Sequence, residues 1–182
     1  AFCEGRKFSA RDQSPTDMVL KRSGNGGQTW MPMQIVMKGV PHAIMDPTPV
    51  VDRTTGIVWL VVDRWPEGYK PAVGLGLDST TAWAMSSSDE GATWSEPVDI
   101  TRTTKKPEWI GLAHGPGVGI QIRSGRLVIP CNNHVGGRTC YVTYSDDHGK
   151  TWHMGGETGP AMSESQVVEL DDGSLVLNMR SY

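Results

Sequence analysis

Four charged side chains in this sequence could together bind an acidic molecule and move a proton. Arg6 and Arg180 each end a short stretch with the character of a β-strand, Asp12 follows Arg6 in an expected loop, and Glu164 precedes an apolar strand at 166–170. A guanidinium group stays charged and holds a carboxylate through two parallel hydrogen bonds. A carboxyl group acts as a general acid if it keeps its proton near the working pH. Each residue alone is an ordinary surface charge, so the prediction of a site depends on all four.

Short β-strands are the elements expected to position these side chains. Helical periodicity is nearly absent, and the apolar segments are short, β-branched and bounded by turns that contain glycine. Three hairpins with glycine in the turn are predicted, formed by 50–53 with 57–62, 119–122 with 127–129, and 166–170 with 175–179. The second strand of each hairpin is almost wholly apolar, which predicts burial on both faces.

One turn pattern, Ser-x-Asx-x-Gly-x-Thr-Trp, occurs three times, starting at Ser23, Ser87 and Ser145. In each copy we expect the Asx side chain to bind backbone amides of its own turn, the glycine to take a positive φ, and the tryptophan to fold beneath the turn as an apolar anchor. The Asx residues are Asn25, Asp89 and Asp147, and the anchors are Trp30, Trp94 and Trp152. A turn that recurs at this period is typical of repeat architectures.

The hairpins alternate with the tryptophan turns, so each period contains two hairpins and therefore one four-stranded antiparallel sheet. Sheets of this size in tandem predict an all-β protein built as a β-propeller. The 182 residues hold roughly three periods, whereas a closed propeller has about four to eight blades. We therefore expect residues 1–182 to be a partial propeller domain, an internal fragment that lacks the start of its first blade and the C-terminal blades.

The composition excludes several kinds of partner. The net charge is −3, from 17 basic and 20 acidic side chains, which offers no electrostatic attraction to nucleic acid or to an anionic membrane. No apolar run approaches the roughly 18 residues of a transmembrane segment. Cys3, Cys131 and Cys140 are too few and too scattered for a disulfide framework or a metal site. We therefore expect buried thiols, no metal and no cofactor.

The repeated turn resembles the Asp-box, or BNR repeat, of the sialidases (neuraminidases), a turn that also occurs in non-catalytic propellers. Segments between the boxes resemble sialidase landmarks, in the family's order and over the whole chain. These segments are 2–6 (Phe-Cys-Glu-Gly-Arg), 45–52 (Met-Asp-Pro-Thr-Pro-Val-Val-Asp), 115–121 (Gly-Pro-Gly-Val-Gly-Ile-Gln), 126–130, 163–169 and 177–181. The family's Asn-Pro-x-Pro stretch has aspartate, Asp46, in place of the usual asparagine. The resemblance implies a six-bladed propeller.

The same resemblance implies an exo-α-sialidase that releases terminal sialic acid from glycoproteins, glycolipids or oligosaccharides with retention of configuration. Sialidases use a tyrosine nucleophile, unlike most glycosidases, because an anionic carboxylate would be repelled by the acidic sugar. By motif, Arg6 and Arg180 match two of the three arginines that hold the substrate carboxylate. Asp12 matches the acid/base, and Glu164 matches the carboxylate that pairs with the nucleophilic tyrosine.

Two further carboxylates compete for these roles. Asp17, at the start of the next strand, competes with Asp12. Glu169, in the half of the hairpin nearer its turn and expected to be solvated, competes with Glu164.

The resemblance gives softer expectations for the substrate pocket. Met45 and Asp46 match positions that line it, and Asn132 and His134 fall where relatives often carry aromatic residues. Asn132 is placed to contact sugar hydroxyl groups, whereas a lone histidine such as His134 is more often structural. Trp109 and His114 lead into the Gly-Pro-Gly loop, where we expect them to shape the rim.

Three catalytic parts of the family have no counterpart in this chain. The first arginine of the triad is expected upstream of residue 1, and the third arginine and the nucleophilic tyrosine are expected beyond residue 182. Tyr182 directly follows the motif of the second arginine, so it is not the nucleophile. We expect the isolated fragment to be inactive and to expose open sheet edges.

Two alternatives stay open. A non-catalytic Asp-box propeller would bind a glycan or a protein and would have no need of all four charged residues. Another propeller glycosidase would carry a pair of carboxylates without an arginine cluster. The sialidase resemblance itself implies a sialylated glycan as the partner, and a location that is extracellular, periplasmic or lysosomal rather than cytoplasmic.

Overall fold

The structure is a computed structural model that describes residues 1–12, 14–68, 76–134 and 138–182. These ranges contain fourteen β-strands and one single-turn helix, joined by turns and loops. The strands are β1 (Phe2–Arg6), β2 (Thr16–Leu20), β3 (Gln34–Met37), β4 (Ala43–Val51), β5 (Val58–Trp65), β6 (Thr81–Ser87), β7 (Val98–Asp99), β8 (Leu112–His114), β9 (Ile120–Gln121), β10 (Leu127–Asn133), β11 (Cys140–Ser145), β12 (His153–Glu157), β13 (Met162–Glu169) and β14 (Leu175–Ser181). The helix is α1 (Thr101–Thr104). In these ranges no helix has the length and apolar character needed to cross a membrane. The predicted all-β class is confirmed.

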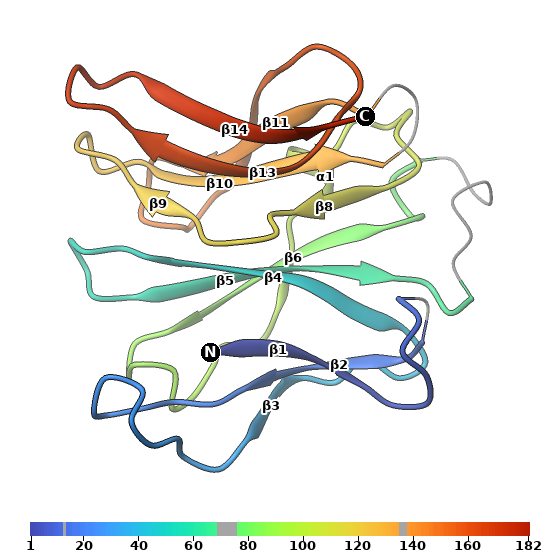
Figure 1. Ribbon diagram of the computed structural model, residues 1–182, viewed down its shortest axis with the longest axis vertical. Helices are drawn as coiled ribbons and strands as arrows, with labels where there is room; N and C mark the ends of the chain where they lie inside the picture. Colours follow the sequence, from blue (N-terminus) through green and yellow to red (C-terminus); the bar gives the residue numbers. More distant parts are fainter. Residues whose placement is uncertain (13, 69–75, 135–137) are drawn as a thin grey trace.

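The strands form three sheets that follow one another along the chain (Figure 1): β1–β7, β8–β12 and β13–β14. The first of these consists of two sets, β1–β3 and β4–β7, which we treat as the first and second sheets of the stack. The first two sets touch through one parallel pair, Thr16 with Ala43, and the other strand pairs of the described ranges are antiparallel. The set β8–β12 has four strand positions, because β8 and β9 pair with the two halves of β10 and are separated by residues 115–119. Two of the predicted four-stranded sheets are therefore complete.

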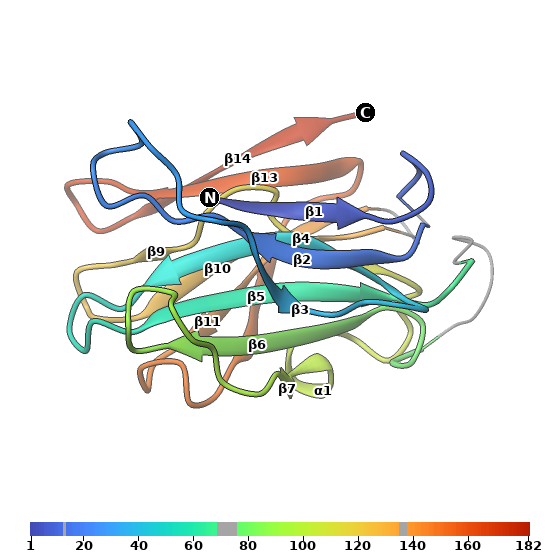
Figure 2. The same ribbon diagram turned by 90° about the horizontal axis from the view of Figure 1, so that it is seen from below.

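Two sides of the stack differ in what connects the strands. The three tryptophan turns, residues 23–30, 87–94 and 145–152, lie on one side, which we call the box end. On the opposite side β1 and β14 end and β13 begins, and we call this the loop end. Figure 1 and the view from below in Figure 2 agree on this arrangement. Arg6, Glu164 and Arg180 all belong to strand termini at the loop end.

The three predicted hairpins are present as β4–β5, β9–β10 and β13–β14. The expected burial of the second strand holds for β5, which is mostly buried, and for β10, which is buried throughout. It is wrong for β14, which is mostly exposed. The reason is that β14 pairs only with β13 in the described ranges, so nothing covers its other edge or its outer face.

Each tryptophan turn closes through its own side chains, as predicted. In the second turn the Ser87 hydroxyl accepts the Gly91 N–H at 2.8 Å, and Asp89 Oδ1 accepts the Thr93 N–H at 2.8 Å. The other two turns repeat these bonds from Ser23 and Asn25 and from Ser145 and Asp147. The glycines take positive φ, as predicted, with 87° at Gly27, 81° at Gly91 and 86° at Gly149.

The tryptophan anchors are not equivalent. Trp152 is 2% exposed and Trp94 is partly buried, as predicted, but Trp30 is 49% exposed and that expectation is wrong. The second and third turns each press on the preceding sheet, since Gly91 lies against Leu20 and Gly149 lies against the Trp59 ring. The first turn has no preceding sheet among the described residues, so its tryptophan has nothing to pack beneath.

Two apolar clusters join the sheets. One lies between the first and second sets and is centred on Met18, Ile44 and Leu60, and the other joins the second and third sets and includes Tyr141 and Trp152. Fully burying one such side chain stabilises the fold by about 1.5–3 kcal/mol. Cys131 and Cys140 are buried, as expected, whereas Cys3 is exposed on β1 and that expectation is wrong.

Candidate active site

Arg6 is the centre of one group of charges at the loop end. It ends β1, and its Nη2 donates to Asp12 Oδ1 at 2.8 Å and to Glu4 Oε2 at 2.9 Å. Its Nη1 donates to the Ala10 carbonyl, which fixes the loop between Arg6 and Asp12. Glu4 and Arg6 are two residues apart on one strand, so their side chains share a face. The structure thus brings together two of the predicted residues, Arg6 and Asp12.

Asp46 lies beside this group. A bulge in β4 between Met45 and Thr48 gives Asp46 a φ of 53°, and its N–H donates to Glu4 Oε1 at 3.2 Å. Burial, followed by the charges of Asp63 and Glu4, raises the pKa of Asp46 well above its usual value. A carboxyl group in such surroundings favours its protonated form, which can donate a hydrogen bond.

Arg180 and Glu164 form a second group at the same end. Arg180 Nη1 donates to Glu164 Oε2 at 3.0 Å, between β14 and β13. The Tyr182 ring lies 4.8 Å from the Arg180 guanidinium and 4.5 Å from that of Arg138, so two cations share one aromatic ring. A hollow of about 330 Å³ opens here, and its lining includes Pro116, Glu164 and Arg180.

The two groups are not joined directly, but the charge of Asp63 acts on a residue beside each of them. In the described residues no hydrogen bond or ion pair joins the Arg6 group to the Arg180 group. However, Asp63 raises the pKa of Asp46 beside Arg6, and it also acts on His134, whose pKa responds to Glu164 as well. Burial is the larger influence on His134 and lowers its pKa below the usual value, so the ring is neutral at neutral pH.

A buried ion pair supports this end from beneath. Asp63 on β5 and His114 on β8 are both fully buried, with 2.7 Å between Asp63 Oδ1 and His114 Nδ1, and the His114 N–H donates to Asp63 Oδ2 at 2.8 Å. Burial opposes the charge on His114, but the neighbouring Cys131 and Asp63 outweigh it and raise the pKa of His114 well above its usual value. The pair ties the second sheet to the third, and the charges of both its members act on Asp46.

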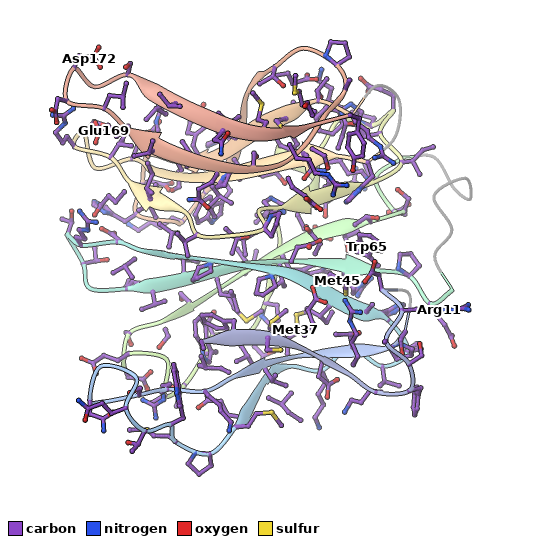
Figure 3. All side chains as sticks on the ribbon, in the orientation of Figure 1. Arg11, Met37, Met45, Trp65, Glu169 and Asp172 are labelled. Atoms are coloured by element: carbon purple, nitrogen blue, oxygen red, sulfur yellow. The ribbon has the colours of Figure 1, made fainter. Side chains whose placement is uncertain are left out.

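The softer pocket expectations have mixed outcomes. Asp46 and His134 lie mostly, though not fully, buried at the loop end, with the His134 ring 5.3 Å from the Trp65 ring. Met45 is 4% exposed and packs with Trp65 (Figure 3), and Asn132 is 1% exposed, so contact with a ligand would need the surface above them to open. Their roles stay predictions. Trp109 and His114 are buried in the core, so the expectation that they shape the rim is wrong.

The competing carboxylates are both engaged in structural contacts. Asp17 is 3% exposed, pairs with Lys7 at 2.5 Å and accepts the Gly39 N–H at 2.9 Å. Glu169 is not solvated as expected, because it pairs with Arg123 at 3.2 Å. Figure 3 shows Glu169 at the box end of β13, far along the strand from the loop end where Arg11 projects. Neither carboxylate lies in the Arg6 or the Arg180 group.

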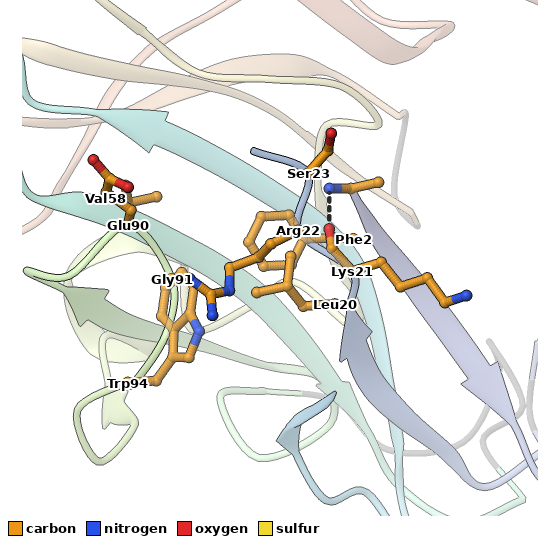
Figure 4. A pocket seen from close by; sticks show the side chains of 10 residues that line it. Phe2, Leu20, Lys21, Arg22, Ser23, Val58, Glu90, Gly91 and Trp94 are labelled. Carbon is orange, nitrogen blue, oxygen red and sulfur yellow. Dashed lines mark hydrogen bonds between the residues drawn. The ribbon is translucent and has the colours of Figure 1, made fainter. Parts of the chain in front are cut away.

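A separate hollow of about 210 Å³ lies at the box end, between the first and second sheets. Figure 4 shows its lining, which includes the Phe2 and Trp94 rings and the Arg22 side chain. None of the predicted catalytic residues borders it. Among the described residues no group of three or more His, Cys, Asp or Glu side chains is arranged to hold a metal ion.

Comparison with known proteins gives the family. A match to the BNR repeat-like domain spans residues 6–182. A sialidase of Bacteroides fragilis (strain YCH46) is 35% identical over 186 aligned residues, which cover 92% of this chain and 34% of the relative. A sialidase of Micromonospora viridifaciens is 33% identical over 198 aligned residues, with 99% and 30% coverage. The chain belongs to the sialidase family.

The fold of this sialidase-family chain agrees with the match. It superposes on the solved structure of the Hadza microbial sialidase Hz136 with a TM-score of 0.85 and 31% identity, over 96% of this chain and 37% of that one. The stacked sheets are therefore those of a β-propeller. The chain spans between 30% and 48% of the length of the curated relatives it matches.

Several residues at the loop end were not predicted from the sequence. Glu4 had a signal, because its position two residues before Arg6 on one strand places both on the same face. Asp63 and Arg138 had none, since their neighbours at the loop end come from sheets or loops distant in the sequence.

Proposed function

We propose that this chain is part of an exo-α-sialidase, a glycoside hydrolase that releases terminal sialic acid from glycoproteins, glycolipids or oligosaccharides with retention of configuration. The observation that carries the proposal is the pairing of Arg6 with Asp12 and of Arg180 with Glu164 at one end of the sheets. Two arginine–carboxylate pairs at the same end suit an acidic sugar, which needs both a cationic clamp and proton transfer.

The two arginines hold the substrate carboxylate in this proposal. Both guanidinium groups are partly exposed and already bind carboxylate oxygens of the protein at 2.8–3.0 Å. A substrate carboxylate would replace some of these contacts, and each guanidinium could hold it through two parallel hydrogen bonds. Asp12 would then be released from Arg6 and would face the glycosidic oxygen.

The chemical step follows from the remaining roles. A tyrosine supplied by the rest of the polypeptide attacks the anomeric carbon while Glu164 takes its phenolic proton. The glycosidic bond breaks, and Asp12 gives its proton to the leaving oxygen. In the second half water attacks the same carbon, Asp12 takes the proton of the water, and the tyrosine oxygen leaves and recovers its proton from Glu164. Two displacements at one carbon retain the configuration.

Asp46 has a further role in the pocket. Its raised pKa favours a neutral carboxyl group that can donate a hydrogen bond. A protonated aspartate therefore offers the sugar a donor where an asparagine amide would offer one, which accounts for aspartate at this position of the motif.

The rest of the site lies in further blades. We propose a six-bladed propeller in which residues 1–182 are an internal part, and the missing arginines and the tyrosine lie outside this range. The isolated part would then be inactive. The exposed β14, with Val176 at 42% and Leu175 at 41% exposure, is the edge on which another strand would pair.

The test uses the complete polypeptide and two substrates, an aryl sialoside with a good leaving group and a sialylated oligosaccharide with a poor one. The parent is expected to cleave both. Asp12→Asn should slow the oligosaccharide by about 10²-fold or more, and the aryl sialoside much less, because only the poor leaving group needs a proton. Arg180→Ala should raise KM by about tenfold or more, because a charge-assisted contact to the substrate is lost.

Neighbouring residues supply matched controls. Arg11→Ala removes an exposed arginine next to Asp12, and Glu169→Gln removes the carboxylate at the other end of β13, so both variants should keep the parental kinetics. Activity should also persist in a chelator. An Asp12→Asn variant with unchanged turnover of both substrates would exclude the acid/base role of Asp12. A parent that cleaves neither substrate would instead favour a non-catalytic propeller that binds a glycan or a protein.

A further inference from the structure

The loop at residues 115–119 separates β8 from β9, and the proposed chemistry assigns it no role. On one side it is fixed to neighbouring strands, because the Gly115 N–H donates to the Pro130 carbonyl at 2.7 Å and the Gly119 N–H donates to the Pro49 carbonyl at 2.9 Å. On the other side it faces β13 of the next sheet. Both ends of this loop are therefore held in place beside β13, the strand that carries Glu164.

The side chain of Gln166, on β13, binds the backbone of this loop. Gln166 Nε2 donates to the Val118 carbonyl at 2.9 Å, and Gln166 Oε1 accepts the Val118 N–H at 3.3 Å. The amide therefore pairs with one backbone residue as a neighbouring strand would. A third bond, from the Ser165 N–H to the Gly115 carbonyl at 3.4 Å, lies alongside. We call these three bonds the clamp.

The clamp needs glycine at the loop. Gly117 has a φ of 140°, and a Cβ there would lie 2.1 Å from Gln166 Oε1. A Cβ at Gly115 would lie 2.7 Å from the Thr48 hydroxyl. The close approach of loop and side chain therefore accounts for the Gly-Pro-Gly spacing of this landmark segment.

Glu164 is the residue that most needs such support. It sits in a bulge of β13 between Ser163 and Ser165, and its φ is 29°, a left-handed value that non-glycine residues rarely adopt. Backbone strain of this kind persists only where the surroundings hold it in place. The clamp bonds begin at the very next residue, so they are placed to hold the Glu164 backbone in this conformation.

We infer that Gln166 is a positioning residue, which through its clamp on Val118 sets the placement of the Glu164 carboxylate. The inference deepens the proposed function, on which its kinetic part rests. The charged groups that face Gln166 in the shared hollow are Glu164 and Arg180, and the loop opposite, residues 115–119, contributes none.

Gln166→Glu is the informative substitution because it preserves the shape and removes one donor. One carboxylate oxygen still accepts the Val118 N–H, but the other faces the Val118 carbonyl and repels it. This repulsion favours the protonated acid, so falling pH restores the donor and the clamp. Gln166→Met keeps the volume and removes both bonds at every pH.

The chain offers a matched control at the box end. Gln121 also joins two sheets with its amide, donating to Asp52 Oδ1 at 2.8 Å and accepting the Arg53 N–H at 2.7 Å. Gln121→Glu would place a second carboxylate beside Asp52 and so disturb the fold at least as much as Gln166→Glu. It lies at the opposite end of the sheets from Glu164.

The experiment measures kcat/KM of the complete polypeptide on a sialoside between about pH 7.5 and about pH 5, as a ratio to the parent at each pH. Gln166→Glu should lose about tenfold or more at the upper pH, as expected for a misplaced catalytic group, and recover part of it at the lower pH. Gln166→Met should stay low throughout. Gln121→Glu should keep a ratio near one.

Amide hydrogen exchange provides a readout that does not depend on activity. Both Gln166 variants should speed exchange of the Val118 and Ser165 amides, and Gln121→Glu should speed exchange near Arg53 instead. Parental exchange at Val118 and Ser165 in Gln166→Met, or equal kinetic losses in the Gln166 and Gln121 variants, would overturn the inference. A parent that cleaves no sialoside would contradict the proposed function. The exchange experiment would still show whether the clamp exists. If Gln166→Glu does not fold, Gln166→Met and Gln121→Met form the test pair.

Discussion

The box end and the loop end lie at opposite ends of the same strands, and they are held together by different kinds of contact. At the box end each turn is complete within eight residues, as when the Ser87 hydroxyl accepts the Gly91 N–H and Asp89 accepts the Thr93 N–H. At the loop end the supports come from distant strands, as when Asp63 binds His114 across two sheets. The box end is therefore stable as a set of local units, whereas the loop end exists only when several sheets are packed together.

The backbones of the two ends differ in the same way. In the boxes the residue before the glycine also takes a positive φ, 58° at Glu90 and 62° at His148, close to the ordinary left-handed region, and the bonds of its own turn hold it. At the loop end Glu164, at 29°, lies away from that region and is held by another sheet. Strain stabilised from a distance is a feature of functional sites rather than of structural turns.

The largest difference is expected when an aspartate is removed from each end. Asp63→Ala leaves the buried His114 without its carboxylate partner, which should lower the free energy of unfolding by about 3–5 kcal/mol. Asp147→Ala removes one cap from an exposed turn and should cost only about 1 kcal/mol, as for other side chains that cap backbone amides. Urea unfolding of the complete polypeptide measures both. Equal losses would show that the loop end is no more dependent on packing than the boxes.

The box end could be predicted from the sequence because its hydrogen bonds join residues that are close together in the chain. Asn25, Asp89 and Asp147 each bind amides only four residues away, so a pattern of eight letters contains every partner. The hairpins could be predicted for the same reason, because a glycine-containing turn between two β-branched runs is recognisable in the sequence itself. Two predictions failed there, the burial of Trp30 and of β14, because burial depends on which sheets pack together and the local sequence does not contain that information.

The loop end could be predicted only in part. Arg6 and Asp12 are six residues apart, and a motif could pair them. The raised pKa of Asp46 depends on burial and on Asp63, which no spacing along the chain indicates. In the sequence Asp63 is only a charged residue near the end of a mostly apolar strand, and its partner His114 comes from β8, 51 residues further along the chain. The supports of the site were invisible because they are contacts between sheets.

A smaller difference is expected between two anchors of the same repeated turn. Trp152→Phe leaves a gap in a core where Trp152 meets Trp59 at 5.9 Å, and should cost about 2 kcal/mol in unfolding free energy. Trp30→Phe changes a side chain that is half exposed and should stay within about 0.5 kcal/mol. Thermal or urea unfolding of both variants measures the difference. A Trp30 variant as unstable as the Trp152 variant would mean that another part of the polypeptide covers the first turn.

The smallest expected effect is on the stability of the fold at acid pH, through Asp89 and Asp147. The Thr93 hydroxyl and amide lower the pKa of Asp89 to about 2, and the pKa of Asp147 is also about 2, because its bonds to Thr151 and Ser145 outweigh the opposing effect of burial. The pKa of an aspartate in an unfolded chain is about 3.9. A depressed pKa means that these carboxylates stabilise the fold above about pH 4 and that this stabilisation is lost as the pH falls toward about 2.

The first turn shows how to remove this dependence without removing the turn. Asn25 makes the same bond to the amide four residues on and carries no charge. The double variant Asp89→Asn with Asp147→Asn should therefore unfold at a urea concentration that changes less between about pH 6 and about pH 2.5 than in the parent. Asp171→Asn, an exposed carboxyl with no hydrogen bond in the described ranges, is the control and should leave the acid sensitivity unchanged. If the double variant loses stability in acid as steeply as the parent, the acid sensitivity comes from carboxylates outside the boxes, and the box end is held together by geometry alone.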